Sequence, residues 1–117
     1  MPRALKPCPS SPNCVSSLAE EGSTHRVPPL SWTGDLASAK ARLRHAVLAA
    51  GNAAFVVEED RYWHLEFRSR IFRFVDDVEF LFDPPTKLIH VRSASRVGHS
   101  DFGVNRKRVE KIRSFFQ

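Results

Sequence analysis

The feature that most constrains this fold is an alternation of inward, mostly apolar positions with outward, mostly polar ones, first over residues 62–69 and again over residues 72–82. In "YWHLEFRS", Trp63, Leu65 and Phe67 share one face, and the residues between them occupy the other. A period of two is typical of strands that bury one face and expose the other. The segment "FRFVDDVEFLF" repeats the pattern, with Asp76 as the one charge among its inward positions, which are otherwise Phe72, Phe74, Val78, Phe80 and Phe82.

Two further strands are predicted beside these. "AAFVVEE" (53–59) comes before a tight turn at "EEDR", and "LIHVRS" (88–93) follows the turn "DPPTK". In the latter strand, Ile89 and Val91 are the inward residues. Links this short favour antiparallel neighbours, so the four segments predict a meander.

Helices are predicted on both sides of the strands. Over residues 35–50 apolar residues recur at helical spacing before a stop at Gly51, with Thr33 or Ser31 as the N-cap and Asp35 in the first turn. A second helix begins near Val104 or Asn105. Its solvent-exposed face is expected to carry the basic residues Arg106, Lys107, Arg108, Lys111 and Arg113.

The order of elements predicts an α+β fold, in which a four-stranded antiparallel meander sheet carries both helices on one face. Residues 1–30 are rich in Pro and Ser and lack periodicity, so we expect an irregular N-terminal arm packed on the domain. Residues 31–117 are expected to form a single domain, which suits a chain of 117 residues.

Charge and length narrow the classes of partner. A net charge of +5 favours acidic partners or anionic ligands. The basic helix "NRKRVEKIR" lacks interleaved aromatic residues, and no nucleic-acid-binding signature surrounds it, so we expect no nucleic-acid partner.

No apolar run approaches the ~20 residues of a membrane span. No signal segment opens the chain, which predicts a cytoplasmic protein; a periplasmic one is the alternative if a leader is missing.

The outward positions of the strands predict a charged sheet face. One interpretation is a solvent face held by cross-strand ion pairs, each contributing roughly 0.2–1 kcal/mol. The other is a floor on which arginines grip a carboxylate or phosphate. No metal-ligand spacing occurs here, so we expect no metal and no cofactor. The face comprises His64, Glu66, Arg68, Asp77, Glu79, His90 and Arg92.

The segment "HVRSASRVGHSDFG" (90–103) predicts a ligand site between a strand and a helix. Its glycines let backbone N–H groups approach a ligand, and a helix N-terminus favours anions. The alternative is a capping loop, in which Asp101 or Asn105 caps the helix. The predicted ligand-binding residues are Arg68, Asp77, Glu79, His90, Arg92, Ser93, Ser95, Arg96, Ser100 and Asn105.

Three functions are consistent with this pattern. The first is a non-catalytic domain that binds a small polar or anionic ligand, which three arginines, Arg68, Arg92 and Arg96, would hold while the acidic residues of the same face orient them. The second is an enzyme with Asp77 or Glu79 as general base and His90 or His99 as acid. The third is an interaction domain that docks a protein through the sheet or the basic helix.

Cys8 and Cys14 have neither a zinc-ribbon nor a thioredoxin spacing. A disulfide between them is feasible in an oxidising compartment and would stabilise the fold by roughly 2 kcal/mol. In the cytoplasm we expect two reduced thiols instead.

Three long blocks of the sequence resemble the family called domain of unknown function 1499. They are "KPCPSSPNCVSS", "FRSRIFRFVDDVEFLFD" and "IHVRSASRVGHSDFGVNRKRVE". The similarity runs from Lys6 to the last helix. It implies a small bacterial or plastid domain, often carried by exported or membrane-tethered proteins, and it brings no activity, cofactor or catalytic residue.

Overall fold

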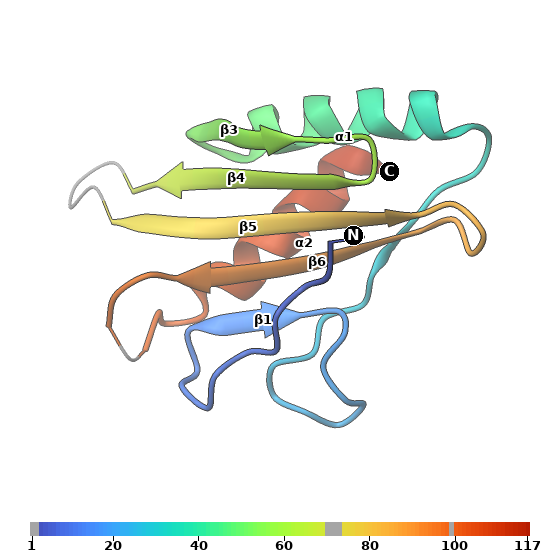
Figure 1. The fold of residues 1–117 in the computed structure, drawn as a ribbon. Helices are drawn as coiled ribbons and strands as arrows, with labels where there is room; N and C mark the ends of the chain where they lie inside the picture. The colour runs from blue at the N-terminus through green and yellow to red at the C-terminus, as the bar shows by residue number, and fades with distance from the viewer. Residues whose placement is uncertain (1–2, 70–73, 99) are drawn as a thin grey trace.

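The computed structural model describes residues 3–69, 74–98 and 100–117 and has the predicted α+β class (Figure 1). Helices α1 and α2 both lie behind one face of an antiparallel sheet (Figure 1). The elements are β1 (Cys14–Ser16), β2 (Leu30–Ser31), α1 (Leu36–Ala50), β3 (Ala53–Glu58), β4 (Tyr62–Arg68), β5 (Val75–Asp83), β6 (Leu88–Ser95) and α2 (Val104–Phe116).

Within the described residues the sheet has six strands rather than the four expected. Strands β3 to β6 form the predicted meander, while β1 and β2 both pair with β6, which gives the order β1-β6-β5-β4-β3. An edge strand presents a row of unpaired backbone groups, and the N-terminal segment supplies the partners. Strands of three and two residues are too short to show an alternation, so the sequence pattern does not reveal them.

The core lies between the sheet and the two helices. From the helices, Leu43 and Val109 pack against it with at most 1% of their surface exposed. Burying a side chain of this size contributes about 1.5–3 kcal/mol, so this layer carries most of the stability. The alternation identified its strand residues correctly, namely Trp63, Leu65, Phe67, Val78, Phe80, Phe82, Ile89 and Val91.

The prediction for Phe74 is wrong, because β5 begins only at Val75 and Phe74 is 54% exposed. Phe72 and Arg73, also assigned to this strand, lie outside the described residues. The chain therefore enters β5 later than the apolar pattern indicates.

Helix α1 begins one residue later than expected, and its N-cap is Asp35, not Thr33 or Ser31. The Asp35 carboxylate accepts a hydrogen bond from the Ser38 amide at 2.7 Å. Ser31 instead belongs to β2, and Gly34, at φ +83°, turns the chain between the strand and the helix. A positive φ favours glycine, so this turn places Asp35 at the cap.

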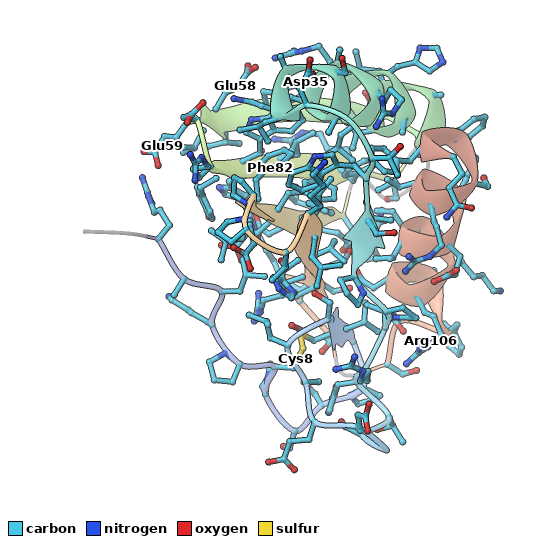
Figure 2. The ribbon with its side chains drawn as sticks, turned by 90° about the vertical axis from the view of Figure 1, so that its right-hand side faces the viewer. Cys8, Asp35, Glu58, Glu59, Phe82 and Arg106 are labelled. Atoms are coloured by element: carbon cyan, nitrogen blue, oxygen red, sulfur yellow. A yellow bond between two sulfur atoms is a disulfide. The ribbon has the colours of Figure 1, made fainter. Side chains whose placement is uncertain are left out.

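The N-terminal segment crosses the sheet face that points away from the helices (Figures 1 and 2). Arg3 pairs with Glu59 at 2.9 Å, and its guanidinium lies 4.8 Å from the centre of the Tyr62 ring. A disulfide joins Cys8 to Cys14 farther along the segment (Figure 2). In the described part of the chain, no helix combines the length and apolar character needed to span a membrane.

Replacing Asp35 with Ala should lower the free energy of unfolding by about 1 kcal/mol, because an amide of the first turn loses its acceptor. Thr33→Ala is the matched control and should change it by less than about 0.5 kcal/mol. Urea unfolding curves of both variants measure the difference. Equal effects would contradict the assignment of Asp35 as the cap.

Candidate functional site

The structure divides the predicted site residues between the two faces of the sheet. Because side chains alternate along β6, Arg92 points to the charged face while Ser93 points toward α2. Ser95 and Asn105 lie with Ser93, and Ser100 lines a hollow beside them. The predicted residues that gather on the charged face are Arg68, Asp77, Glu79, His90, Arg92 and Arg96.

Arginines and carboxylates of the charged face are already joined to one another. Arg96 binds Asp77 at 2.8 Å and Glu66 at 2.5 Å, and Arg68 lies 3.3 Å from Glu66. His64 completes the group with a 2.7 Å contact between its Nε2 and Asp77. The guanidinium groups are thus neutralised in place, which weakens the idea that they form an anion site.

Arg92 lies under the N-terminal segment and is largely buried. Its Nη1 is 3.6 Å from a Glu79 oxygen and its Nη2 is 3.5 Å from the Pro7 carbonyl. Within the described residues its Nε has no hydrogen-bond partner. The Tyr62 hydroxyl donates to Glu79 at 2.5 Å, and burial together with this contact raises the pKa of Tyr62 above its usual range.

The geometry offers little to the enzyme hypothesis. Asp77 is held by Arg96 and His64, and Glu79 by Tyr62 and Arg92. His99 lies outside the described residues. Among the described residues, no group of three His, Cys, Asp or Glu side chains is placed to hold a metal ion.

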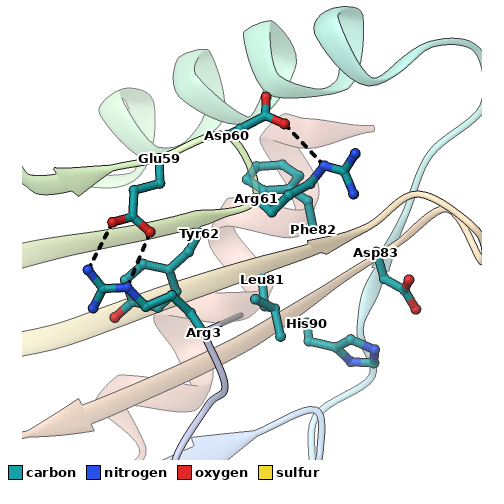
Figure 3. Close-up of a pocket in the computed structure, with 9 residues that line it drawn as sticks. All are labelled: Arg3, Glu59, Asp60, Arg61, Tyr62, Leu81, Phe82, Asp83 and His90. Atoms are coloured by element: carbon teal, nitrogen blue, oxygen red, sulfur yellow. Dashed lines mark hydrogen bonds and ion pairs between the residues drawn. The ribbon is translucent and has the colours of Figure 1, made fainter. Parts of the chain in front are cut away.

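A hollow of about 490 Å³ lies on the charged face beneath Arg3 (Figure 3). We call it the arm hollow. Four of its charged groups occur as exposed pairs, Arg3 with Glu59 and Arg61 with Asp60, and Asp83 also lines it (Figure 3). Exposed ion pairs contribute about 0–1 kcal/mol and rearrange easily, so this hollow presents no fixed recognition surface.

A second hollow, of about 430 Å³, lies on the other face, between the start of β5, the end of β6 and the start of α2. We call it the loop pocket. Four of its apolar side chains are widely exposed: Phe74 (54%), Val97 (60%), Phe102 (88%) and Val104 (45%). Grouped exposed apolar residues mark binding surfaces more often than single ones do. Its other lining residues are Ser69, Asp76, Ser95, Gly98, Ser100, Asp101 and Arg108.

A buried ion pair contributes to the lining of the loop pocket. Arg108 Nη2 lies 2.6 Å from Asp76 Oδ2, with side chains only 14% and 11% exposed. Asn105 and Ser93 support the pair, since Arg108 Nη1 donates to Asn105 Oδ1 at 2.8 Å and Ser93 Oγ donates to the same oxygen at 2.7 Å. The Arg108 guanidinium also lies 5.1 Å from the centre of the Phe67 ring. The pocket therefore joins apolar walls to a fixed polar group.

With this geometry in place, comparison with known proteins identifies the family. The model of the DUF1499 family, described as a protein of unknown function, matches residues 4–116. The chain belongs to the DUF1499 family. No curated protein matches it.

For this DUF1499 domain, Asp76 and Arg108 are the site residues that sequence reasoning missed. The prediction that Arg108 lies on the solvent-exposed face of the helix is wrong, because its side chain is largely buried and pairs with Asp76. A signal was present: a carboxylate on the apolar face of a strand requires a partner from the layer that covers it. Asn105, predicted to cap the helix or to be buried and hydrogen-bonded, is fully buried. Its backbone N–H donates to the Asp101 carboxylate at 3.0 Å.

Phe102 combines high exposure with an uncommon backbone conformation. Its φ of +55° lies in the left-handed region, which costs a non-glycine residue on the order of 1 kcal/mol. The side chain is also 88% exposed, so core packing does not offset that cost. Such a residue at the rim of a pocket favours a role in binding.

Asp76→Ala should destabilise this DUF1499 domain by about 3–5 kcal/mol, because Arg108 would remain buried without its counter-charge. Arg96→Ala, which removes a cation from the charged face, should cost less than about 1 kcal/mol. Chemical unfolding measures both. The double variant Asp76→Leu with Arg108→Met should recover much of the loss; a double variant as unstable as Asp76→Ala would contradict the account.

The stability of this DUF1499 domain should depend on Asp77 at acidic pH. Burial raises the pKa of Asp77, but hydrogen bonds from Arg96 and His64 outweigh it and hold the pKa below the ordinary value of 3.8. The stabilisation is therefore complete above that value and is lost as the pH falls through the lower folded-state pKa. Between about pH 5 and pH 2, wild type should lose more stability than Asp77→Asn. Urea unfolding at each pH measures this, and parallel losses would contradict it.

Proposed function

We propose that this domain binds a small, largely apolar molecule in the loop pocket. The observation that carries the proposal is the ring of exposed apolar residues around the buried Asp76–Arg108 pair. Small-molecule sites commonly combine apolar walls with a few fixed polar groups, in volumes of about 300–1,000 Å³. The loop pocket, at about 430 Å³, falls in this range.

The charges of the loop pocket indicate which polar group the ligand carries. Asp76 and Asp101 contribute two negative charges and Arg108 one positive charge, a formal sum of −1. Burial raises the pKa of Asp101, but hydrogen bonds from Asn105 and Gly103 outweigh it and keep this carboxyl ionised near neutral pH. A neutral or cationic group therefore fits better than an anion. The proposal keeps the small ligand and the loop 90–103 that the sequence suggested, but it replaces the expected anionic ligand with a neutral or cationic one.

The arm hollow is a weaker place for the same function. Its lining is dominated by charged side chains that pair with one another, and Leu81 is one of its few apolar contributors. A ligand there would compete with Glu59 and Asp60 for the two arginines of the hollow. The loop pocket instead offers exposed apolar area, to which Val97 and Phe102 contribute.

The neutral dye N-phenyl-1-naphthylamine, which fluoresces in apolar surroundings, should bind the wild-type protein. Phe102→Ser should weaken its binding roughly tenfold, because the largest exposed wall of the pocket is lost. Leu48→Ser is the matched control: Leu48 is 53% exposed but lies on α1. This control should leave the affinity unchanged. Fluorescence titration measures all three proteins.

The anionic relative 8-anilinonaphthalene-1-sulfonate tests the charge argument. It should bind more weakly than the neutral dye, because the loop pocket has a formal negative charge. Two outcomes would contradict the proposal: no binding of the neutral dye, or equal losses in Phe102→Ser and Leu48→Ser. Tighter binding of the anionic dye would contradict the assigned ligand charge alone.

A further inference from the structure

We propose that the Cys8–Cys14 disulfide regulates ligand affinity at the loop pocket, and that Asn13 transmits the effect. The inference rests on the proposed function, since it concerns the same pocket. It begins from the place of the disulfide in the chain. Cys14 is the first residue of β1 and is 1% exposed, while Asn13 immediately precedes it and is 5% exposed. The disulfide thus closes a short ring that ends directly beside Asn13.

Asn13 binds the loop pocket's framework at three points. Its Nδ2 donates to the Gly98 carbonyl at 2.7 Å. Its own carbonyl accepts from the Ser95 amide at 3.0 Å and from Asn105 Nδ2 at 3.2 Å. Ser95 and Gly98 line the pocket, and Asn105 holds Arg108 of the ion pair. One buried residue of the N-terminal segment therefore connects the loop through its side chain, and the end of β6 and the start of α2 through its backbone carbonyl.

The closed ring fixes the position from which Asn13 makes these bonds. Within the ring, Ser11 Oγ donates to Asn13 Oδ1 at 2.8 Å, which sets the orientation of the amide. A disulfide removes conformational freedom from the segment it closes, so less entropy is lost when the segment is ordered. Opening the ring restores that freedom. The three bonds to the loop then become harder to hold, and the loop pocket is less pre-organised for its ligand.

Reduction can begin at the exposed end of the disulfide. Cys8 is partly exposed, whereas Cys14 is buried, so the thiolate of a dithiol reductant attacks Cys8 Sγ. This forms a mixed disulfide between the reductant and Cys8, and the bond between Cys8 Sγ and Cys14 Sγ breaks. Cys14 Sγ leaves as a thiolate and then takes a proton from water. The second thiol of the reductant then displaces Cys8 Sγ. The reductant supplies two electrons and becomes a cyclic disulfide, while the protein gains two thiols.

The test compares Cys8→Ser with wild type, using N-phenyl-1-naphthylamine affinity and amide hydrogen exchange at Ser95. We expect roughly fivefold weaker dye binding or more, and faster exchange of the Ser95 amide, since this amide donates to Asn13. Wild type treated with dithiothreitol should behave like Cys8→Ser. Ser10→Ala is the matched control, because it changes an exposed residue of the same ring and keeps the disulfide.

Asn13→Ala tests the route. It removes the Nδ2 bond to the Gly98 carbonyl and keeps the two bonds of the backbone carbonyl. In the oxidised protein it should therefore weaken dye binding, by less than Cys8→Ser does, and the two substitutions together should do little more than Cys8→Ser alone. Additive losses would overturn the role of Asn13. Unchanged dye affinity in Cys8→Ser would overturn the inference and leave the proposed function intact. A wild-type protein that binds no dye would overturn both.

Discussion

The ion pair between Asp76 and Arg108 is the interaction on which the arrangement of this domain depends. Asp76 occupies an inward position of β5, where an ionised carboxylate without a partner would be strongly destabilising. Its partner comes from α2, so the helix must lie over β5 at a level that brings Arg108 to it. Asn105 and Ser93 both accept hydrogen bonds from Arg108 Nη1. The apolar core alone would permit α2 to slide; the charges define its register.

This constraint explains which parts of the fold can be predicted from the sequence. The alternation over β4 and β5 reports a local property, the side of the sheet to which each residue points, and it identified the buried strand residues. It also singled out Asp76. The partner of Asp76 could not be found in the same way, because the rotation of α2 about its axis depends on packing against several strands. Helical spacing predicted that Arg108 is solvent-exposed like the basic residues next to it. In the structure Arg108 is instead largely buried, because it forms an ion pair with Asp76.

The candidate site shows a second limit of sequence reasoning. Residues 92–105 are close in the chain and rich in donors, which suggested a single cluster. Within β6, however, neighbouring residues belong to opposite faces, so Arg92 faces the N-terminal segment while Ser93 faces α2. The ion pairs of Arg96 and Arg68 likewise arise from strand register, which aligns Glu66 with Asp77. Composition indicated the charges correctly, but only the register shows that they neutralise one another.

The N-terminal segment has more structural roles than the sequence predicted for it. As an irregular arm it would only cover a surface, whereas in the structure it supplies β1, covers Arg92 and bonds to the loop beside α2. Short strands and single buried amides leave no periodic trace, so these functions are absent from any pattern analysis. They follow instead from the pairing of backbone groups that the edge of β6 and the Gly98 carbonyl both present. The same requirement that completes the sheet therefore ties the disulfide-bearing segment to the loop pocket.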